Sequence, residues 1–159
     1  KDFLKKAFTI IFIASLLIWF LQSFNFRFEM VNDSSKSILA FIGNKLAFIF
    51  KPLGFSDWRL STSLITGITA KESVVSTLSV LTNSSTPVAL NHALNMLLTP
   101  ASAFAFLTFT VLYMPCVAAF AATKRELGSW LQAILTAMYQ TGIAYVVAFM
   151  VYRLALLIS

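Results

Sequence analysis

Residues Leu60 to Leu81 read LSTSLITGITAKESVVSTLSVL, a long apolar segment that carries Lys71 and Glu72 near its middle. Gly67 stands shortly before this charged pair, between two threonines, and weakens a helix at that point. Unwound turns occur inside membranes where they line a cavity. The segment therefore predicts either a broken spanning helix or a re-entrant hairpin that enters a membrane and returns.

The composition of the whole chain also indicates a membrane. Hydrophobic residues make up 58% of the 159 residues and charged residues 11%, against roughly half and a quarter in a soluble domain. A chain of this length cannot bury so much apolar surface in its own core, so we expect lipid contact. The net charge is +6, and the basic residues lie mostly at the ends of apolar runs, as is typical of the flanks of membrane helices. This placement argues against a nucleic-acid partner.

Glu72 gives the strongest energetic signal in the sequence. A carboxylate in mid-membrane costs roughly 2.5–3.5 kcal/mol on insertion scales, so it needs a partner, a watery cavity or a function. Lys71 is adjacent, but neighbours on a helix do not face each other, and a direct pair needs unwound backbone. If the following residues are helical, Glu72, Ser76 and Ser79 share one face. Two interpretations stay open: an ion pathway, or a salt-bridged or snorkelling pair at an interface.

The N-terminal part predicts one crossing and one interfacial helix. Ala7 to Phe24 is an apolar run behind the basic flank KDFLKK, long enough with its edges to cross the hydrocarbon core. Its lysine-rich end is expected in the cytoplasm. After a polar connection, Ser37 to Phe55 is apolar but interrupted by polar residues and ends near Pro52. We expect an amphipathic helix in the interface plane there, with a spanning helix as the alternative.

The C-terminal part predicts two further crossings. Thr82 to Pro100 holds no Lys, Arg, Asp or Glu and is predicted as a loop outside the cytoplasm, with His92 solvated. Ala101 to Thr123 and Trp130 to Tyr152 are predicted to span, joined by a short basic loop. The predicted fold is an all-α integral membrane bundle of three or four spanning or re-entrant helices plus the interfacial helix.

Pro115 and Cys116 form the second candidate position. Proline has no N–H, so Pro115 cannot donate to the carbonyl of Val111, and its ring clashes there. We therefore expect a kink that leaves a polar oxygen unpaired. Cys116 at the kink offers a thiolate, a soft ligand for a transition metal, and the freed carbonyl adds an oxygen. The alternative is that Cys116 is a small hydrophobic residue.

Several classes of protein are excluded by what the sequence lacks. A single cysteine excludes an internal disulfide framework and a closed all-cysteine zinc site. There is no phosphate loop of the G-x-x-x-x-G-K-[ST] type and no Ser, His and Asp set suited to nucleophilic catalysis. We expect a transporter segment without a cofactor of its own, not an enzyme. Because the chain begins with Lys1, we also expect a piece of a longer protein.

Two motifs carry a resemblance to a known family. The stretch FKPLGFSDWRLSTSLITGITAKESVVSTLSVL, Phe50 to Leu81, contains AKE-x-VVSTL, and LYMPCVAAFAATKRELGSW, Leu112 to Trp130, contains PC-x-A. Both are similar to the membrane region of the ferrous iron transporter B (FeoB) family. The opening FLKKAFTIIFIASLLIWFL looks like the start of that family's second gate region. The likeness runs over nearly the whole chain in the same order.

The resemblance implies that residues 1–159 are the C-terminal transmembrane gate region of a larger transporter. Its GTPase domain, helical linker domain and first gate half would lie outside this chain. The resemblance further implies Fe2+ as the transported substrate, GTP and Mg2+ in the full-length protein, and a multi-pass location in a bacterial inner membrane. The implied partners are the lipid bilayer, the remaining transporter domains, small accessory proteins of the same uptake system and, as a further option, a second copy in a homo-oligomer.

The resemblance also assigns residues to the transport path. The positions that match the gate motif are Lys71, Glu72, Ser76 and Thr77, and those that match the motif of the iron path are Pro115 and Cys116. We add Gly67 to the predicted path or gate as the weak point of the helix. Our hypothesis is that Glu72 and Cys116 bind Fe2+ in passage and that water, backbone oxygens or the missing gate half complete the ligands. Two alternatives are a gate-type permease for nucleosides or other solutes, and a structural module that anchors the GTPase part.

Overall fold

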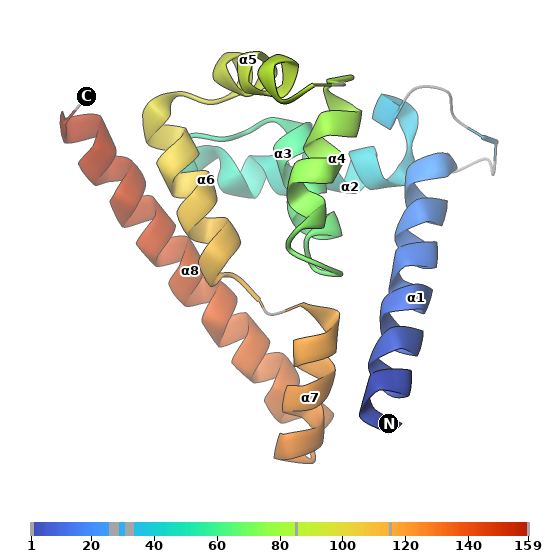
Figure 1. Cartoon of the computed structure of the whole chain (residues 1–159). Helices are drawn as coiled ribbons and strands as arrows, with labels where there is room; N and C mark the ends of the chain where they lie inside the picture. Colours follow the sequence, from blue (N-terminus) through green and yellow to red (C-terminus); the bar gives the residue numbers. More distant parts are fainter. Residues whose placement is uncertain (1, 26–28, 31–33, 85, 115, 159) are drawn as a thin grey trace.

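A computed structural model describes residues 2–25, 29–30, 34–84, 86–114 and 116–158, and these residues are helical over most of their length (Figure 1). The helices in chain order are α1 (Asp2–Ser23), η1 (Ser34–Lys36), α2 (Ile38–Phe50), η2 (Lys51–Leu53), α3 (Trp58–Thr66), α4 (Ser73–Leu81), α5 (Pro87–Leu97), α6 (Pro100–Leu112), α7 (Val117–Leu127) and α8 (Trp130–Ile158). The predicted all-α architecture is confirmed.

The long helix α8 forms one side of the molecule, and α6 and then α7 pack along it (Figure 1). Helix α1 stands on the opposite side and contacts α2 and α7. Between these two sides, α3 and α4 form a hairpin whose tip points toward the connection from α6 to α7, while α5 lies across the far end. The hairpin therefore lies between α1 on one side and α6 with α8 on the other.

Among the helices of the described residues, α8 is long and apolar enough to cross a membrane by itself. Two pairs of helices pass the same criterion together but are bent: Ile38–Leu53 with Trp58–Thr66 by 105°, and Pro87–Leu97 with Pro100–Leu112 by 108°. If each bent pair is one span, the described residues supply up to 3 crossings. Among the described residues, Phe12–Ser23 of α1 is a shorter apolar helix.

Helix α2 begins at a capping serine and has two apolar sides. The Ser37 hydroxyl accepts the Ala40 N–H at 3.1 Å, which satisfies one of the unpaired N–H groups of the first turn. One side of α2 is buried against α3, and Gly43 permits this approach, because a Cβ there would lie 2.9 Å from the Trp58 carbonyl oxygen. The opposite side exposes Phe41 and Phe48. An exposed apolar side suits the interfacial position that the sequence predicts.

An aromatic cluster joins the end of α2 to α6. Phe50 packs edge-on against Phe109 at 5.1 Å between ring centroids, and Phe55 packs edge-on against Phe106 at 5.3 Å. Offset and edge-to-face pairs of this kind contribute about 0.5–1.5 kcal/mol beyond their area burial. The cluster fixes the start of the hairpin, at α3, relative to α6.

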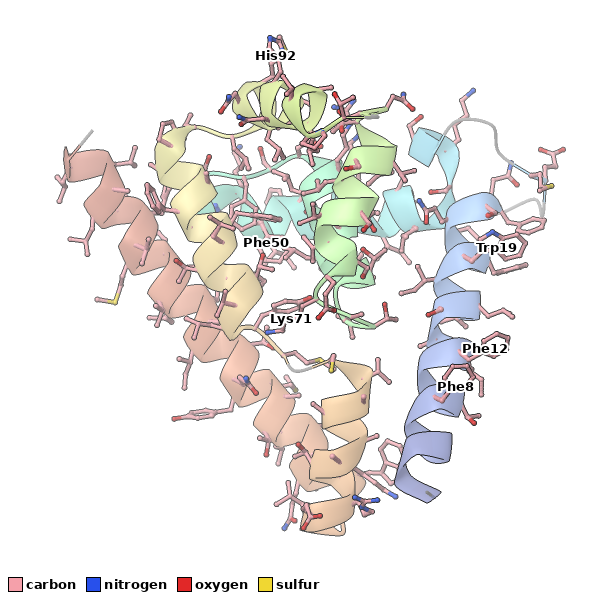
Figure 2. All side chains as sticks on the ribbon, in the orientation of Figure 1. Phe8, Phe12, Trp19, Phe50, Lys71 and His92 are labelled. Atoms are coloured by element: carbon pink, nitrogen blue, oxygen red, sulfur yellow. The ribbon has the colours of Figure 1, made fainter. Side chains whose placement is uncertain are left out.

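Two sequence predictions differ from the structure. The segment from Thr82 to Pro100, predicted as a loop, contains α5, because Thr86 caps its first turn by accepting the Ala89 N–H and Pro87 has a φ suited to that turn. His92 on this helix is exposed, as predicted (Figure 2).

The second difference concerns the predicted span from Ala101 to Thr123. It is divided into two helices, since α6 ends at Leu112 and α7 begins at Val117. Pro115 itself lies outside the described residues. The missing N–H of a proline removes one helical hydrogen bond, and here the interruption is a complete break and not a kink.

We predict that Gly54→Ala destabilises the protein more than Gly128→Ala. Both glycines have a positive φ, +81° and +66°, so each alanine costs about 1 kcal/mol in left-handed strain. At Gly54 the added Cβ would also collide with the Tyr152 ring of α8, whereas at Gly128 it meets nothing within 4 Å. We expect a further loss of about 1–3 kcal/mol for Gly54→Ala alone. Thermal unfolding of the full-length parent in detergent measures the difference, and equal losses would contradict the packing.

Candidate functional site

The hairpin closes through buried hydroxyls. Helix α3 ends at Thr66, residues 67–72 turn without regular helix, and α4 begins at Ser73. We call residues 67–72 the hairpin tip. The Thr66 and Thr77 hydroxyls form a buried hydrogen bond at 2.8 Å, and α3 and α4 pack against each other. Of the two forms that the sequence leaves open, a broken helix or a hairpin, the structure has the hairpin.

The hairpin tip fits into the interruption between α6 and α7, which we call the α6–α7 break and which runs from the end of α6 at Leu112 to the start of α7 at Val117. The Val117 N–H donates to the Ile68 carbonyl at 2.8 Å. The Tyr113 hydroxyl donates to the Leu64 carbonyl at 3.0 Å, in the last turn of α3. Helix ends leave such backbone groups unpaired, so the hairpin and the break satisfy each other.

Lys71 makes the third link between the tip and the break (Figure 2). Its Nζ donates to the Val111 carbonyl at 2.7 Å, lies 3.5 Å from the Tyr113 carbonyl oxygen and sits 5.1 Å from the centroid of the Tyr113 ring. The Val111 carbonyl is the oxygen that the sequence predicts to be left without a helical partner. Its partner is an ammonium group from 40 residues earlier in the chain.

Lys71 does not pair with Glu72. Both side chains are described, and no ion pair joins them. Glu72 precedes the first turn of α4, makes no capping hydrogen bond with its side chain and is exposed. The interpretation of these two residues as a salt bridge is therefore wrong, and the carboxylate at the end of the hairpin tip stays accessible.

The other gate-motif residues divide into two groups. Ser76 is exposed on α4, and Ser79 is half-buried, so the polar face that begins at Glu72 continues along the helix. Thr77 is buried and bonded to Thr66, which makes it a part of the hairpin closure. Accessible oxygens on this helix thus come from Glu72 and Ser76.

Cys116 lies half-buried at the N-terminal end of α7, as a free cysteine. It stands one residue before Val117, whose N–H binds the hairpin tip. Pro115, the other member of the motif, falls outside the described residues. Within the described ranges, no three His, Cys, Asp or Glu side chains come together in a way that could hold a metal ion. Further ligands for a cation at this junction would be backbone oxygens and water.

Gly67 contributes close packing at the tip. Its φ of −62° is ordinary, but a Cβ there would lie 2.5 Å from the Tyr113 hydroxyl oxygen and 2.5 Å from a methyl carbon of Val74. Only a hydrogen leaves room for the tyrosine to reach the end of α3. The sequence assigns Gly67 to a weak point in a helix, and the structure adds this steric reason.

Tyr113 is a residue of the candidate site that is not predicted from the sequence. It is buried, donates to α3 and lies under Lys71. A tyrosine in an apolar run next to a helix-breaking motif is a signal, because a buried hydroxyl needs a partner. Which partner it takes depends on the tertiary fold.

Comparisons with known proteins place the chain in a family. The family model named Gate, described as nucleoside recognition, matches residues 4–130. The chain belongs to the Gate family. No solved structure matches this Gate chain.

The Gate chain is 36% identical over 154 residues to the Fe(2+) transporter FeoB of Staphylococcus aureus, covering 97% of this chain and 23% of that protein. It is 38% identical over 162 residues to the Fe(2+) transporter FeoB of Methanocaldococcus jannaschii, covering 94% of this chain and 23% of that protein. A Porphyromonas gingivalis protein named Fe(2+) transport protein A/Fe(2+) transporter FeoB fusion protein is 28% identical over 203 residues, covering 98% of this chain and 24% of that protein.

The resemblance to the FeoB family that the two motifs indicate is thus confirmed. The Gate chain spans about a quarter of the length of these curated relatives, 23% for the first two.

We predict that Tyr113→Phe weakens the protein while Tyr139→Phe leaves it unchanged. Tyr113 loses its hydrogen bond to the Leu64 carbonyl and leaves that buried oxygen unpaired, at a cost of about 1–3 kcal/mol. Tyr139 is 71% exposed on α8 and serves as the matched control. Apparent melting temperatures of the full-length parent and the two variants test this, and a Tyr113→Phe protein as stable as the parent would show that the bond is dispensable.

We also predict that Gly67→Ala separates the hairpin from the break. The added methyl group requires movement of the Tyr113 hydroxyl or of Val74, with an overpacking cost of about 1–3 kcal/mol. Gly142→Ala is the control, because a Cβ at Gly142 in α8 meets nothing within 4 Å. Limited proteolysis between α6 and α7 together with thermal unfolding reports the change. Identical behaviour of the two variants would count against close packing at the tip.

Proposed function

We propose that this chain forms part of the ion path of a ferrous iron permease in a bacterial inner membrane. The names of the FeoB relatives, and the FeoB-like motifs at the hairpin tip and the break, support Fe2+ as the transported substrate. Because the chain spans 23% of such a relative, the GTPase domain that binds GTP and Mg2+ belongs, in this proposal, to the remaining part of a multi-pass protein.

One observation carries the proposal: two interrupted segments of backbone meet at one place. Three hydrogen bonds join the end of the hairpin to the end of α6 and the α6–α7 break: Val117 with Ile68, Tyr113 with Leu64 of α3, and Lys71 with Val111 of α6. Glu72 belongs to the hairpin tip, and Cys116 belongs to the break. Interrupted helices at membrane depth are where transporters hold ions, because carbonyl oxygens and helix ends become available there. Ordinary packing gives no reason to interrupt both segments at the same place.

The side chains at the junction suit a transition metal in passage. Glu72 offers an exposed carboxylate, a hard oxygen ligand, and Cys116 offers a softer sulfur ligand that is only half-buried. An Fe2+ ion would exchange hydration water for these ligands one step at a time, with Ser76 as a further oxygen on the same face as Glu72. Two side chains bind such an ion incompletely, which favours release over retention.

The partners follow from the same comparisons. The Porphyromonas gingivalis relative joins a part named Fe(2+) transport protein A to FeoB in one chain. We therefore include an accessory protein of that kind among the partners, besides the lipid bilayer and the remaining transporter domains. A homo-oligomer stays a proposal that native mass spectrometry of the full-length parent would test.

The Gate description as nucleoside recognition favours a second candidate, a permease for nucleosides. In that case Glu72 would accept hydrogen bonds from sugar hydroxyls, and the sulfur of Cys116 would have no role. Competition separates the two candidates: excess Mn2+ or Co2+ should reduce Fe2+ uptake, and excess uridine should not. Inhibition by uridine alone would support the nucleoside candidate.

We predict that Glu72→Gln and Cys116→Ser each lower Fe2+ uptake by about tenfold or more, the effect of losing about 1.4 kcal/mol of transition-state stabilisation. The measurement is uptake of radioactive Fe2+ in cells that carry the full-length parent, normalised to transporter in the membrane. Glu126→Gln is the matched control, because Glu126 is an exposed carboxylate at the end of α7, away from the hairpin tip. Uptake that is unchanged in both site variants would reduce this segment to a structural module.

A further inference from the structure

The contacts of the Lys71 ammonium group are those that a protein gives to a bound cation. It contacts two backbone oxygens, those of Val111 at 2.7 Å and Tyr113 at 3.5 Å, and it lies over the Tyr113 ring at 5.1 Å. The shorter contact has the length of a charge-assisted hydrogen bond, and the ring contributes a cation–π attraction. Carbonyl oxygens with an aromatic face make a site for a positive charge, and here the chain fills that site itself.

The site lies at the C-terminal end of α6, where the helix dipole favours cations. The last carbonyls of a helix have no intrahelical partner and carry partial negative charge. A cation in mid-membrane is costly, so Lys71 needs compensating contacts of this kind. The same oxygens would offer any other cation at this depth the same compensation.

A cavity leads to Lys71 from the side of α5. Its volume is about 410 Å3, and α4, α5 and α6 form its walls, with Asn91 and Asn95 from α5 and Thr110 from α6 among the polar groups. Lys71 also lines it, and Figure 2 shows this residue well away from α5. None of the residues that line this cavity is acidic. A cation that enters this cavity therefore meets no carboxylate on the walls and a positive charge at their inner end.

We propose that Lys71 is a tethered cation that closes the path: its ammonium occupies the carbonyl site at the C-terminal end of α6 until a transported cation displaces it. This inference rests on the proposed function and adds a gate to it. Glu72, the next residue and the last of the hairpin tip, is exposed. An Fe2+ ion bound at Glu72 repels the ammonium of Lys71 and so opens the site that the ion then enters.

A purely structural cap differs from this gate in one property. A cap needs only a hydrogen-bond donor for the Val111 carbonyl, whereas the gate needs a positive charge. Lys71→Gln removes the charge and keeps an N–H donor, and Lys71→Arg keeps both. The two variants therefore separate capping from closure.

The experiment uses the full-length parent in liposomes without nucleotide, with a fluorescent dye inside that responds to Fe2+ under anaerobic conditions. A parallel set carries a Tl+-responsive dye, because Tl+ is a monovalent cation that carbonyl oxygens coordinate. We expect Lys71→Gln to raise the influx of both ions by about tenfold, equivalent to lowering the barrier by about 1.4 kcal/mol. Lys71→Arg should stay at the parental level, and so should Lys45→Gln, which removes an exposed charge from α2.

Each outcome decides one question. Parental influx of both ions in a Lys71→Gln protein with a parental melting temperature overturns the gate and leaves Lys71 as a cap. If Lys71→Gln does not fold, Lys71→Met and Lys71→Arg are compared in the same assay, and equal influx in these two overturns the gate. If the parent moves no Fe2+ even with GTP, the proposed function fails, while the Tl+ comparison still decides whether Lys71 closes a cation path.

Discussion

Unpaired backbone groups at two chain interruptions are the constraint on which this structure depends. In an environment without water, an N–H or a carbonyl that lacks a partner costs several kcal/mol, so irregular backbone survives only where protein or a cavity satisfies it. Here three hydrogen bonds supply partners at the two interruptions: Ile68 with Val117, Leu64 at the end of α3 with Tyr113, and Lys71 with Val111 at the end of α6. Each interruption thus supplies partners for backbone groups at the other.

The rest of the fold serves to bring these interruptions together. Alanines of α8 that are fully buried, Ala144 and Ala148, allow α6 to lie close along it. The aromatic cluster around Phe50 then ties α2 and the start of the hairpin to α6. Regular helices thus supply the rigid frame, and the irregular segments supply exposed oxygens and sulfur at one point.

Much of this arrangement can be predicted from local chemistry. Hydrophobic runs with charged ends predict membrane helices, and the glycine and charges near Lys71 predict an interruption. The missing N–H of Pro115 predicts a free carbonyl at Val111. Each of these signals depends on residues close together in the sequence, so no knowledge of the fold is needed.

The remainder depends on contacts across the fold. Lys71 binds Val111 and not Glu72, and Tyr113 caps α3. Both contacts require the hairpin to lie against the break, and no local sequence pattern predicts that arrangement. The sequence prediction omits α5 for another reason: the absence of charge from Thr82 to Pro100 indicates on which side of a membrane a segment lies, but not whether it is helical. Thr86 followed by Pro87 was the local signal for it.

The contact between Gly54 and Tyr152 has a mechanical consequence. Through it, α8 bears on the turn that ends η2, while the same helix also carries α6 and α7 along its length. The Tyr145 hydroxyl adds a bond to the Ile49 carbonyl of α2 at 2.9 Å. Helix α8 is thus attached to α2 and η2 as well as to α6 and α7. A change in its tilt, as in a thinner or thicker bilayer, therefore acts on the elements that carry the hairpin and on those that form the break.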